Sequence, residues 1–179
     1  VIQAKTQGNP FYMREMLGAA YRSRCIWYEY QEARWVFDLD KLFEQFKSEH
    51  DYDFLDNDFV TRRLSELPPA SRSLLAWASL VGTSFSFQLI CTLLELDSTG
   101  SGCLSSGDSQ IHNTYTKEDA VAGLQAAISA YIIVQGETDD RFRFTHDRYV
   151  QAASCLRECN KTSMHYHIAQ TFMKMDTLD

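Results

Sequence analysis

Residues 131–145 of the sequence are YIIVQGETDDRFRFT, two runs of branched and aromatic residues on either side of a polar turn. Such runs are typical of strands, so we predict two strands over 131–135 and 141–145 that pair around the turn at 136–140. Upstream of them, apolar residues recur at the three- and four-residue spacing of amphipathic helices. This spacing predicts three helices, over residues 71–81, 86–96 and 116–130.

Three helices followed by two paired strands is the order of elements in a winged helix. The buried faces of the helices are predicted from their apolar positions, which are Leu74, Leu75, Ala78 and Val81, then Leu89, Ile90, Leu93 and Leu94, then Val121, Leu124, Ala127 and Ile128. Thr116 and Asp119 have the spacing of a capping box at the start of the third helix. Residues 97–113 are rich in Ser, Gly, Thr and Asp, which predicts a mobile insertion between the second and third helices.

The N-terminal part of the chain has its own helix and hairpin signals. A helix is predicted to start at Gly8-Asn9-Pro10, because Asn caps free N–H groups and Pro at the first helical position needs no donor. Arg14 and Glu15 are predicted to point away from its apolar face, which consists of Met13, Met16, Leu17 and Ala20. Residues 25–30 and 34–37 predict a short hairpin, and a helix follows over residues 38–47.

The acidic stretch 49–58 has the carboxylates of a calcium site without the required spacing. An EF-hand loop that began at Asp51 would need Gly at its sixth position and Glu at its twelfth, where Asp56 and Arg62 stand. We therefore predict a solvated linker that leads into a helix ending at Pro68-Pro69, with a buried stripe of Val60, Leu64 and Leu67.

Two further helices are predicted over 147–156 and 162–175, the last of which is interpreted as the start of a helical repeat array. The predicted fold class is therefore mainly α-helical with two short β-hairpins.

Composition and charge restrict the class of protein. The 179 residues are 45% hydrophobic and 13% aromatic, so the chain can bury a core and is no disordered tail. A net charge of -7 and a pI near 5.2 disfavour nucleic acid and anionic membranes as partners. No apolar run approaches the ~20 residues of a membrane span, and five cysteines, an odd number, fit a reducing compartment. We interpret the sequence as a segment of a longer soluble chain and expect it in the cytoplasm.

One arrangement in the sequence has the geometry of an anion-binding site. A strand ends and a helix begins around His146, and a helix N-terminus offers N–H groups and partial positive charge, to which an imidazole adds a donor. The alternative is that Thr145 or Asp147 caps the helix while His146 packs between strand and helix. Both interpretations stay open at this point.

Other kinds of chemistry are disfavoured by the sequence. The predicted helix 116–130 has Lys117 as its only cation, beside Glu118 and Asp119, so it lacks the basic surface of a DNA-reading helix. No structural-zinc spacing joins Cys155, Cys159, His165 and His167. The sequence contains neither a phosphate-binding G-x-x-x-x-G-K-S/T loop nor a nucleophile elbow, so we expect no catalysis from this chain by itself.

Several segments resemble parts of the STAND-type signalling ATPases. Residues 6–17, TQGNPFYMREML, resemble the GNPFF-x-x-E-L segment of their helical lid, and residues 59–80 resemble the passage from lid to winged helix. Residues 142–153, FRFTHDRYVQAA, resemble their F-x-F-x-H-D-R-x-Q-x-A segment. The aromatic hairpin CIWYEYQEARWVFDLD, residues 25–40, is similar to that of the large hybrid histidine kinases of fungi, which carry such an ATPase core.

This resemblance implies a switch in which lid and winged helix close over ADP or ATP. The nucleotide and its Mg²⁺ would be held by a phosphate loop in an upstream nucleotide-binding domain. By resemblance, His146 would reach the terminal phosphate of ADP and Pro10 would pack near the adenine, while Arg14 is either a lid arginine facing phosphate or a solvated helix residue. The implied partners are that upstream domain and downstream helical and sensor-kinase domains of the same chain, and the implied role is to couple nucleotide state to a phosphorelay.

The resemblance also divides the chain. It implies a lid segment over 1–67, a winged-helix-like domain over 68–146 and closing helices over 147–179. Two other functions stay open: a protein-interaction scaffold without a working nucleotide site, and a DNA-binding winged-helix regulator, which the acidic composition disfavours.

Overall fold

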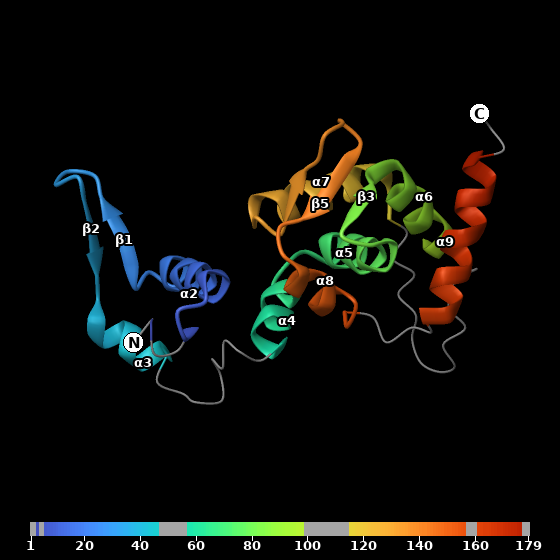
Figure 1. Cartoon of the computed structure of the whole chain (residues 1–179). Helices are drawn as coiled ribbons and strands as arrows, with labels where there is room; N and C mark the ends of the chain where they lie inside the picture. Colours follow the sequence, from blue (N-terminus) through green and yellow to red (C-terminus); the bar gives the residue numbers. More distant parts are fainter. Residues whose placement is uncertain (1–2, 4–5, 47–56, 99–114, 157–160, 177–179) are drawn as a thin grey trace. The chain divides into compact units, whose positions relative to one another are not determined.

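The computed structural model describes residues 3, 6–46, 57–98, 115–156 and 161–176, which form eight helices and two small antiparallel sheets (Figure 1). The predicted fold class, mainly α-helical with short hairpins, is confirmed. The contacts divide the chain into two compact units, Val1–Val60 and Thr61–Asp179. The predicted linker up to residue 56 and the predicted insertion from residue 99 lie outside the described residues.

The first unit contains a helix, a hairpin and a second helix: α2 (Pro10–Arg22), β1 (Ile26–Glu29), β2 (Arg34–Phe37) and α3 (Leu39–Phe46). The predicted start of α2 is confirmed, because the Asn9 side chain accepts a hydrogen bond from the Phe11 N–H at 3.0 Å and Pro10 occupies the first turn. The predicted hairpin is confirmed as well, with Tyr28 directly opposite Trp35.

The buried face of α2 differs from the predicted one. Glu15, predicted to point away, is buried, and Leu17, predicted to be buried, is 42% exposed. The buried residues of α2 are Phe11, Tyr12, Glu15, Met16 and Ala20. The buried face is therefore rotated by about one residue toward the N-terminus from the predicted apolar face. Periodicity identified the helix correctly, but the hairpin that packs on it determines which row is covered.

The second unit contains the end of α4 and all later elements. They are α4 (Asn57–Ser65), α5 (Pro69–Val81), β3 (Ser84–Ser86), α6 (Phe87–Ser98), α7 (Lys117–Ser129), β4 (Ile133–Gln135), β5 (Arg141–Phe144), α8 (Asp147–Ala153) and α9 (Lys161–Asp176). The predicted hairpin is present as β4 and β5, and the sheet has a third strand, so its order is β3-β5-β4. The prediction had missed β3, because three residues carry no period of their own and the strand exists through its pairing with β5.

Helix α5 lies at the centre of the second unit and contacts α6, α7, α8 and α9. Its side chains Leu74, Leu75 and Ala78 are fully buried, as predicted. It approaches α7 closely at Gly123, where an added Cβ would lie 3.0 Å from the Ala70 carbonyl carbon and from the Ser71 nitrogen. The buried Ser71 hydroxyl donates to the Gly123 carbonyl oxygen at 2.9 Å, which ties the two helices at the same point.

Helix α7 begins with the predicted capping box. The Thr116 hydroxyl accepts from the Asp119 N–H at 3.2 Å, and the Asp119 carboxylate accepts from the Thr116 N–H at 3.0 Å. Its predicted buried face was partly wrong, because Val121 and Ile128 are 37% and 38% exposed. Leu124 and Ala127 are buried as predicted, together with Ala120 and Gly123. The small residues Ala120, Gly123 and Ala127 permit the close approach to α5.

Candidate functional site

His146 stands between strand β5 and helix α8 and caps the helix itself. Its backbone is extended, and its Nδ1 accepts a hydrogen bond from the Arg148 N–H at 3.1 Å. The expectation that Thr145 or Asp147 supplies the cap is therefore wrong. The Thr145 hydroxyl instead donates to the Tyr131 carbonyl oxygen at 2.9 Å, which joins the end of β5 to the connection before β4.

The cap bond sets the state of the His146 ring. A ring nitrogen that accepts a hydrogen bond carries no hydrogen, so in the neutral imidazole the hydrogen is on Nε2, which becomes the donor. His146 is exposed, so the expectation that it packs between strand and helix is also wrong. Helix α8 has only seven residues, so its dipole adds little to anion binding. Any role of His146 toward an anion therefore rests on the Nε2–H group.

The segment that follows His146 is anchored in the core. Tyr149, in the first turn of α8, is fully buried. The Arg63 guanidinium lies 5.8 Å from the centre of the Tyr149 ring, and its Nη2 donates to the Ala130 carbonyl oxygen at 2.6 Å. Arg63 therefore connects α4, the end of α7 and α8, and holds the start of α8 in place.

Pro10 and Arg14 lie in the first unit, one turn apart on α2. Pro10 is exposed at the first helical position. The Arg14 side chain is 44% exposed; its Nη2 lies 3.5 Å from the Glu15 carboxylate, and its guanidinium lies 5.9 Å from the centre of the Phe11 ring. Arg14 thus interacts with its own helix. A nucleotide site that includes Pro10, Arg14 and His146 stays a prediction.

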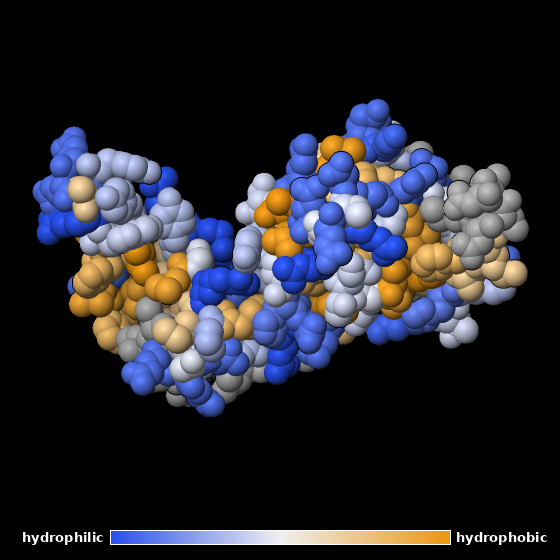
Figure 2. Space-filling model, turned by 45° about the horizontal axis from the view of Figure 1, so that its top comes forward, coloured by the Kyte–Doolittle hydropathy of each residue, from blue (hydrophilic) through white to orange (hydrophobic). Residues whose placement is uncertain are grey.

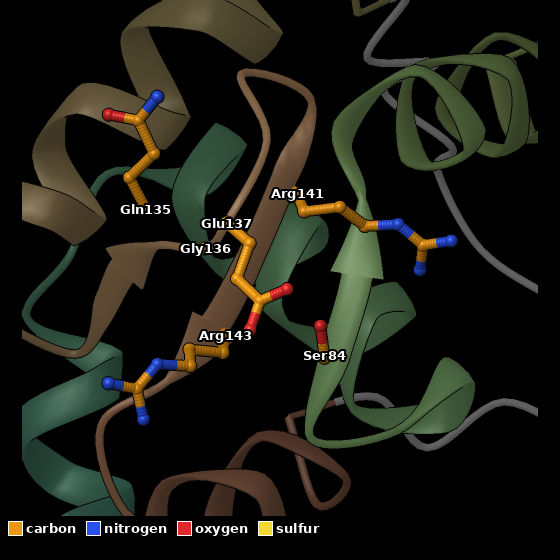
Figure 3. A pocket seen from close by; sticks show the side chains of 6 residues that line it. All are labelled: Ser84, Gln135, Gly136, Glu137, Arg141 and Arg143. Atoms are coloured by element: carbon orange, nitrogen blue, oxygen red, sulfur yellow. The ribbon is translucent and has the colours of Figure 1, made fainter.

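The structure adds a polar hollow that the sequence argument had missed. It lies on the three-stranded sheet and its turn and is lined by Ser84, Gln135, Gly136, Glu137, Arg141 and Arg143 (Figure 3). The sequence signal that points to it is the alternation Arg-Phe-Arg-Phe along β5, which places two arginines on one face of a strand.

In the described ranges, no three His, Cys, Asp or Glu side chains gather as a metal site. Within the described residues, Cys25, Cys91 and Cys155 form no disulfide. No helix in the described part of the chain combines the length and the apolar character needed to cross a membrane.

The comparison with known proteins gives one informative relative. The chain is 28% identical over 172 residues to the peroxide stress-activated histidine kinase mak3 of Schizosaccharomyces pombe, a match that covers 94% of this chain and 6% of that kinase. No family model matches the chain, and no solved structure matches it. The similarity supports a histidine-kinase-related protein with a role in signalling, and the chain corresponds to a small part of that relative's length.

Proposed function

We propose that this chain is the regulatory segment, lid plus winged helix, of a nucleotide-dependent signalling ATPase inside a multidomain histidine kinase. The observation that carries the proposal is the similarity to a histidine kinase along nearly the whole chain, which corresponds to only 6% of that kinase. The sequence itself contains no phosphate-binding loop. A regulatory segment that acts on a nucleotide bound by a neighbouring domain accounts for both facts.

The architecture of the second unit supports the winged-helix part of the proposal. Its elements follow the order α5, β3, α6, α7, β4, β5, and the sheet order β3-β5-β4 places the last strand in the middle. We assign residues 68–146 to this winged helix, 1–67 to the lid and 147–179 to closing helices. In this assignment β4, β5 and their turn form the wing.

His146 is the residue we propose for nucleotide contact. The cap bond from the Arg148 N–H orients the ring through its Nδ1, and in the neutral imidazole Nε2 carries the hydrogen, which is the kind of donor that a terminal phosphate of ADP would accept from. Pro10 would pack near the adenine, and Arg14 would leave its contact with Glu15 to face phosphate. ADP or ATP, with Mg²⁺, would be bound by the upstream domain. A coupling of about 1–3 kcal/mol is enough for such a switch, which is on the scale of a charge-assisted hydrogen bond.

The experiment measures ADP retained by the purified full-length histidine kinase and by two variants. His146→Ala removes both the imidazole and the cap, whereas His146→Ser removes the imidazole and keeps a good cap residue. We expect both variants to release ADP about tenfold faster, because a lost charge-assisted hydrogen bond is worth about 1.5–3 kcal/mol. His167→Ala, which removes an imidazole from α9, serves as the matched control and should leave retention unchanged.

Two outcomes contradict the proposal. If His146→Ser retains ADP like the unchanged protein, His146 acts only as a helix cap. If the unchanged protein holds no nucleotide, the nucleotide switch itself is wrong.

A protein-interaction scaffold is the second candidate function, and the hairpin of the first unit favours it. Figure 2 shows hydrophobic residues at the surface of this unit. In its hairpin, the aromatic side chains of Tyr30, Trp35 and Phe37 are each more than half exposed. The Trp35 ring contacts Tyr21 at 6.0 Å and Tyr28 at 5.4 Å between centroids, so the aromatic surface is ordered. Exposed, ordered aromatic residues are typical of protein interfaces. A kinase without bound nucleotide would leave this function as the better explanation.

A further inference from the structure

Strand β5 separates its side chains strictly by face. Phe142 and Phe144 are buried, and their rings contact that of Phe85 at centroid distances of 6.3 and 5.8 Å. Arg141 and Arg143 are exposed on the opposite face of the same strand. Because β5 is hydrogen-bonded to β3 on one side and to β4 on the other, the backbone under both arginines is fixed.

The carboxylates next to the two arginines are engaged elsewhere. Asp140 accepts from the Ser86 hydroxyl and, at 2.9 Å, from the Gln88 N–H, so it caps the start of α6. Asp139 accepts from the Gln135 amide at 3.4 Å. In the described part of the chain, neither Arg141 nor Arg143 forms an ion pair. Two guanidinium groups on one face of the sheet thus share a single neighbouring carboxylate, that of Glu137, in a protein whose net charge is -7.

The two arginines line the hollow together with Ser84, which lies directly opposite Arg143 on β3. Figure 3 shows the Arg141 and Arg143 side chains extending to opposite sides, with the Glu137 carboxylate between them. Glu137 belongs to the turn between β4 and β5, which is held by the bond from the Gly136 N–H to the Arg141 carbonyl oxygen. The hollow therefore presents two positive charges that flank a negative one.

We infer that this face binds an extended acidic segment of a protein partner, with carboxylates at alternate positions. Arg141 and Arg143 are two residues apart on one strand, a repeat of about 6.6 Å. Carboxylates two residues apart on an extended segment have the same repeat, so such a segment can run along β5 in register with the two arginines. The two exposed side chains, which Figure 3 shows extended to opposite sides, would turn toward it so that each guanidinium meets one carboxylate. The Ser84 hydroxyl adds a donor at the Arg143 end. The inference goes beyond the proposed function and requires no nucleotide.

The central Glu137 favours an extended segment over a compact anion. A single phosphate placed between the two arginines would meet the Glu137 carboxylate, and like charges repel. A segment with carboxylates at positions one and three has an uncharged residue at position two. This residue would lie next to Glu137, so no carboxylate of the segment is placed directly against the Glu137 carboxylate. Nucleic acid is disfavoured by the net charge of -7, because a phosphate backbone extends well beyond these two cations.

The test is binding of a fluorescent hexapeptide that alternates glutamate and threonine to the 179-residue chain, followed by anisotropy at low ionic strength. From the usual scale of exposed ion pairs, Arg141→Gln and Arg143→Gln should each weaken binding about threefold and the double variant about tenfold. Glu137→Gln should tighten binding about twofold, since it removes a repulsive charge of the same scale. Circular dichroism checks that these exposed substitutions leave the fold unchanged.

Arg34→Gln is the matched control, because Arg34 is an exposed arginine on another strand, β2, where it pairs with Glu32. Its replacement changes the net charge by the same amount as Arg141→Gln or Arg143→Gln. It should leave peptide affinity unchanged. Absence of peptide binding to the unchanged chain, or equal weakening by Arg34→Gln, overturns the inference. If inorganic phosphate competes as well as the peptide, the inference is wrong and the ligand is a compact anion. If duplex DNA binds in preference to the peptide, the inference is wrong and the ligand is nucleic acid.

Discussion

Replacement of Gly123 by alanine tests the packing of α5 on α7, on which the second unit depends. An added Cβ would lie 3.0 Å from two backbone atoms of α5, Ala70 C and Ser71 N, and 3.2 Å from the Ala70 oxygen. Ordinary contacts of a Cβ begin at 3.4 Å, so the helices would have to separate by several tenths of an ångström. That movement also stretches the buried bond between the Ser71 hydroxyl and the Gly123 carbonyl.

The magnitude follows from two opposing effects. Overpacking of a tight contact costs about 1–3 kcal/mol, and alanine is favoured over glycine inside a helix by about 1 kcal/mol. Because the contact is backbone against backbone, we expect the first effect to exceed the second and Gly123→Ala to destabilise the second unit by about 1 kcal/mol. For a chain of this size, that lowers the melting temperature by about 2–4 °C in a thermal scan followed by circular dichroism.

Gly18→Ala is the matched control for helix propensity. Gly18 lies inside α2, and a Cβ there would meet only the flexible end of Arg22 at 3.3 Å. The same chemical change should therefore stabilise the first unit by up to about 1 kcal/mol. If Gly123→Ala raised the melting temperature as Gly18→Ala does, the close approach of α5 and α7 would be wrong.

Arg63→Met removes the hydrogen bond to the Ala130 carbonyl and the cation over the buried Tyr149 ring. It should lower the free energy of unfolding by about 1–2 kcal/mol in urea titrations. An unchanged urea midpoint would contradict the proposed role of Arg63 in joining α4, α7 and α8. Hydrogen bonds from Thr116 lower the pKa of the Asp119 carboxyl. The unchanged chain should therefore be more stable than Asp119→Asn above the ordinary carboxyl pKa, and this difference should disappear as the pH falls through the lowered pKa. A difference in stability that persists at still lower pH would contradict this prediction. Burial, with a contribution from Glu95, raises the pKa of the Cys91 thiol. Iodoacetamide should therefore modify Cys91 more slowly than the exposed Cys155, as measured by peptide mass spectrometry. Equal modification rates would contradict the prediction and show that Cys91 is accessible.

Sequence reasoning succeeded where a structure depends on neighbouring residues. The helix starts at Pro10 and at Lys117 were predicted because Asn9 and Thr116 make their capping bonds within three residues. It was less accurate where the outcome depends on a distant element. Val121 and Ile128 fit the apolar period of α7, but the small residues of the adjacent row permit the close contact with α5, so that row is buried.

The candidate site shows the same division. His146 was singled out from a strand-to-helix junction in the sequence, and the structure places it at that junction. Its role as the cap was missed because His is not among the strongly preferred cap residues, whereas Thr145 and Asp147 beside it are. Thr145 is drawn away from the cap by the Tyr131 carbonyl, a partner fourteen residues upstream that no local pattern indicates.

In the segment from Arg141 to Tyr149, exposed groups that both proposals use stand on a backbone anchored by buried aromatic residues. Phe142 and Phe144 fix the strand from below, and the fully buried Tyr149 fixes the first turn of α8. Between these anchors, the backbone at Arg143 and His146 has little freedom, because shifting either residue would pull an aromatic side chain out of the core. Rigid presentation reduces the entropy lost when a ligand binds, so a donor or cation placed here gains affinity that the same group on a loose loop would lack.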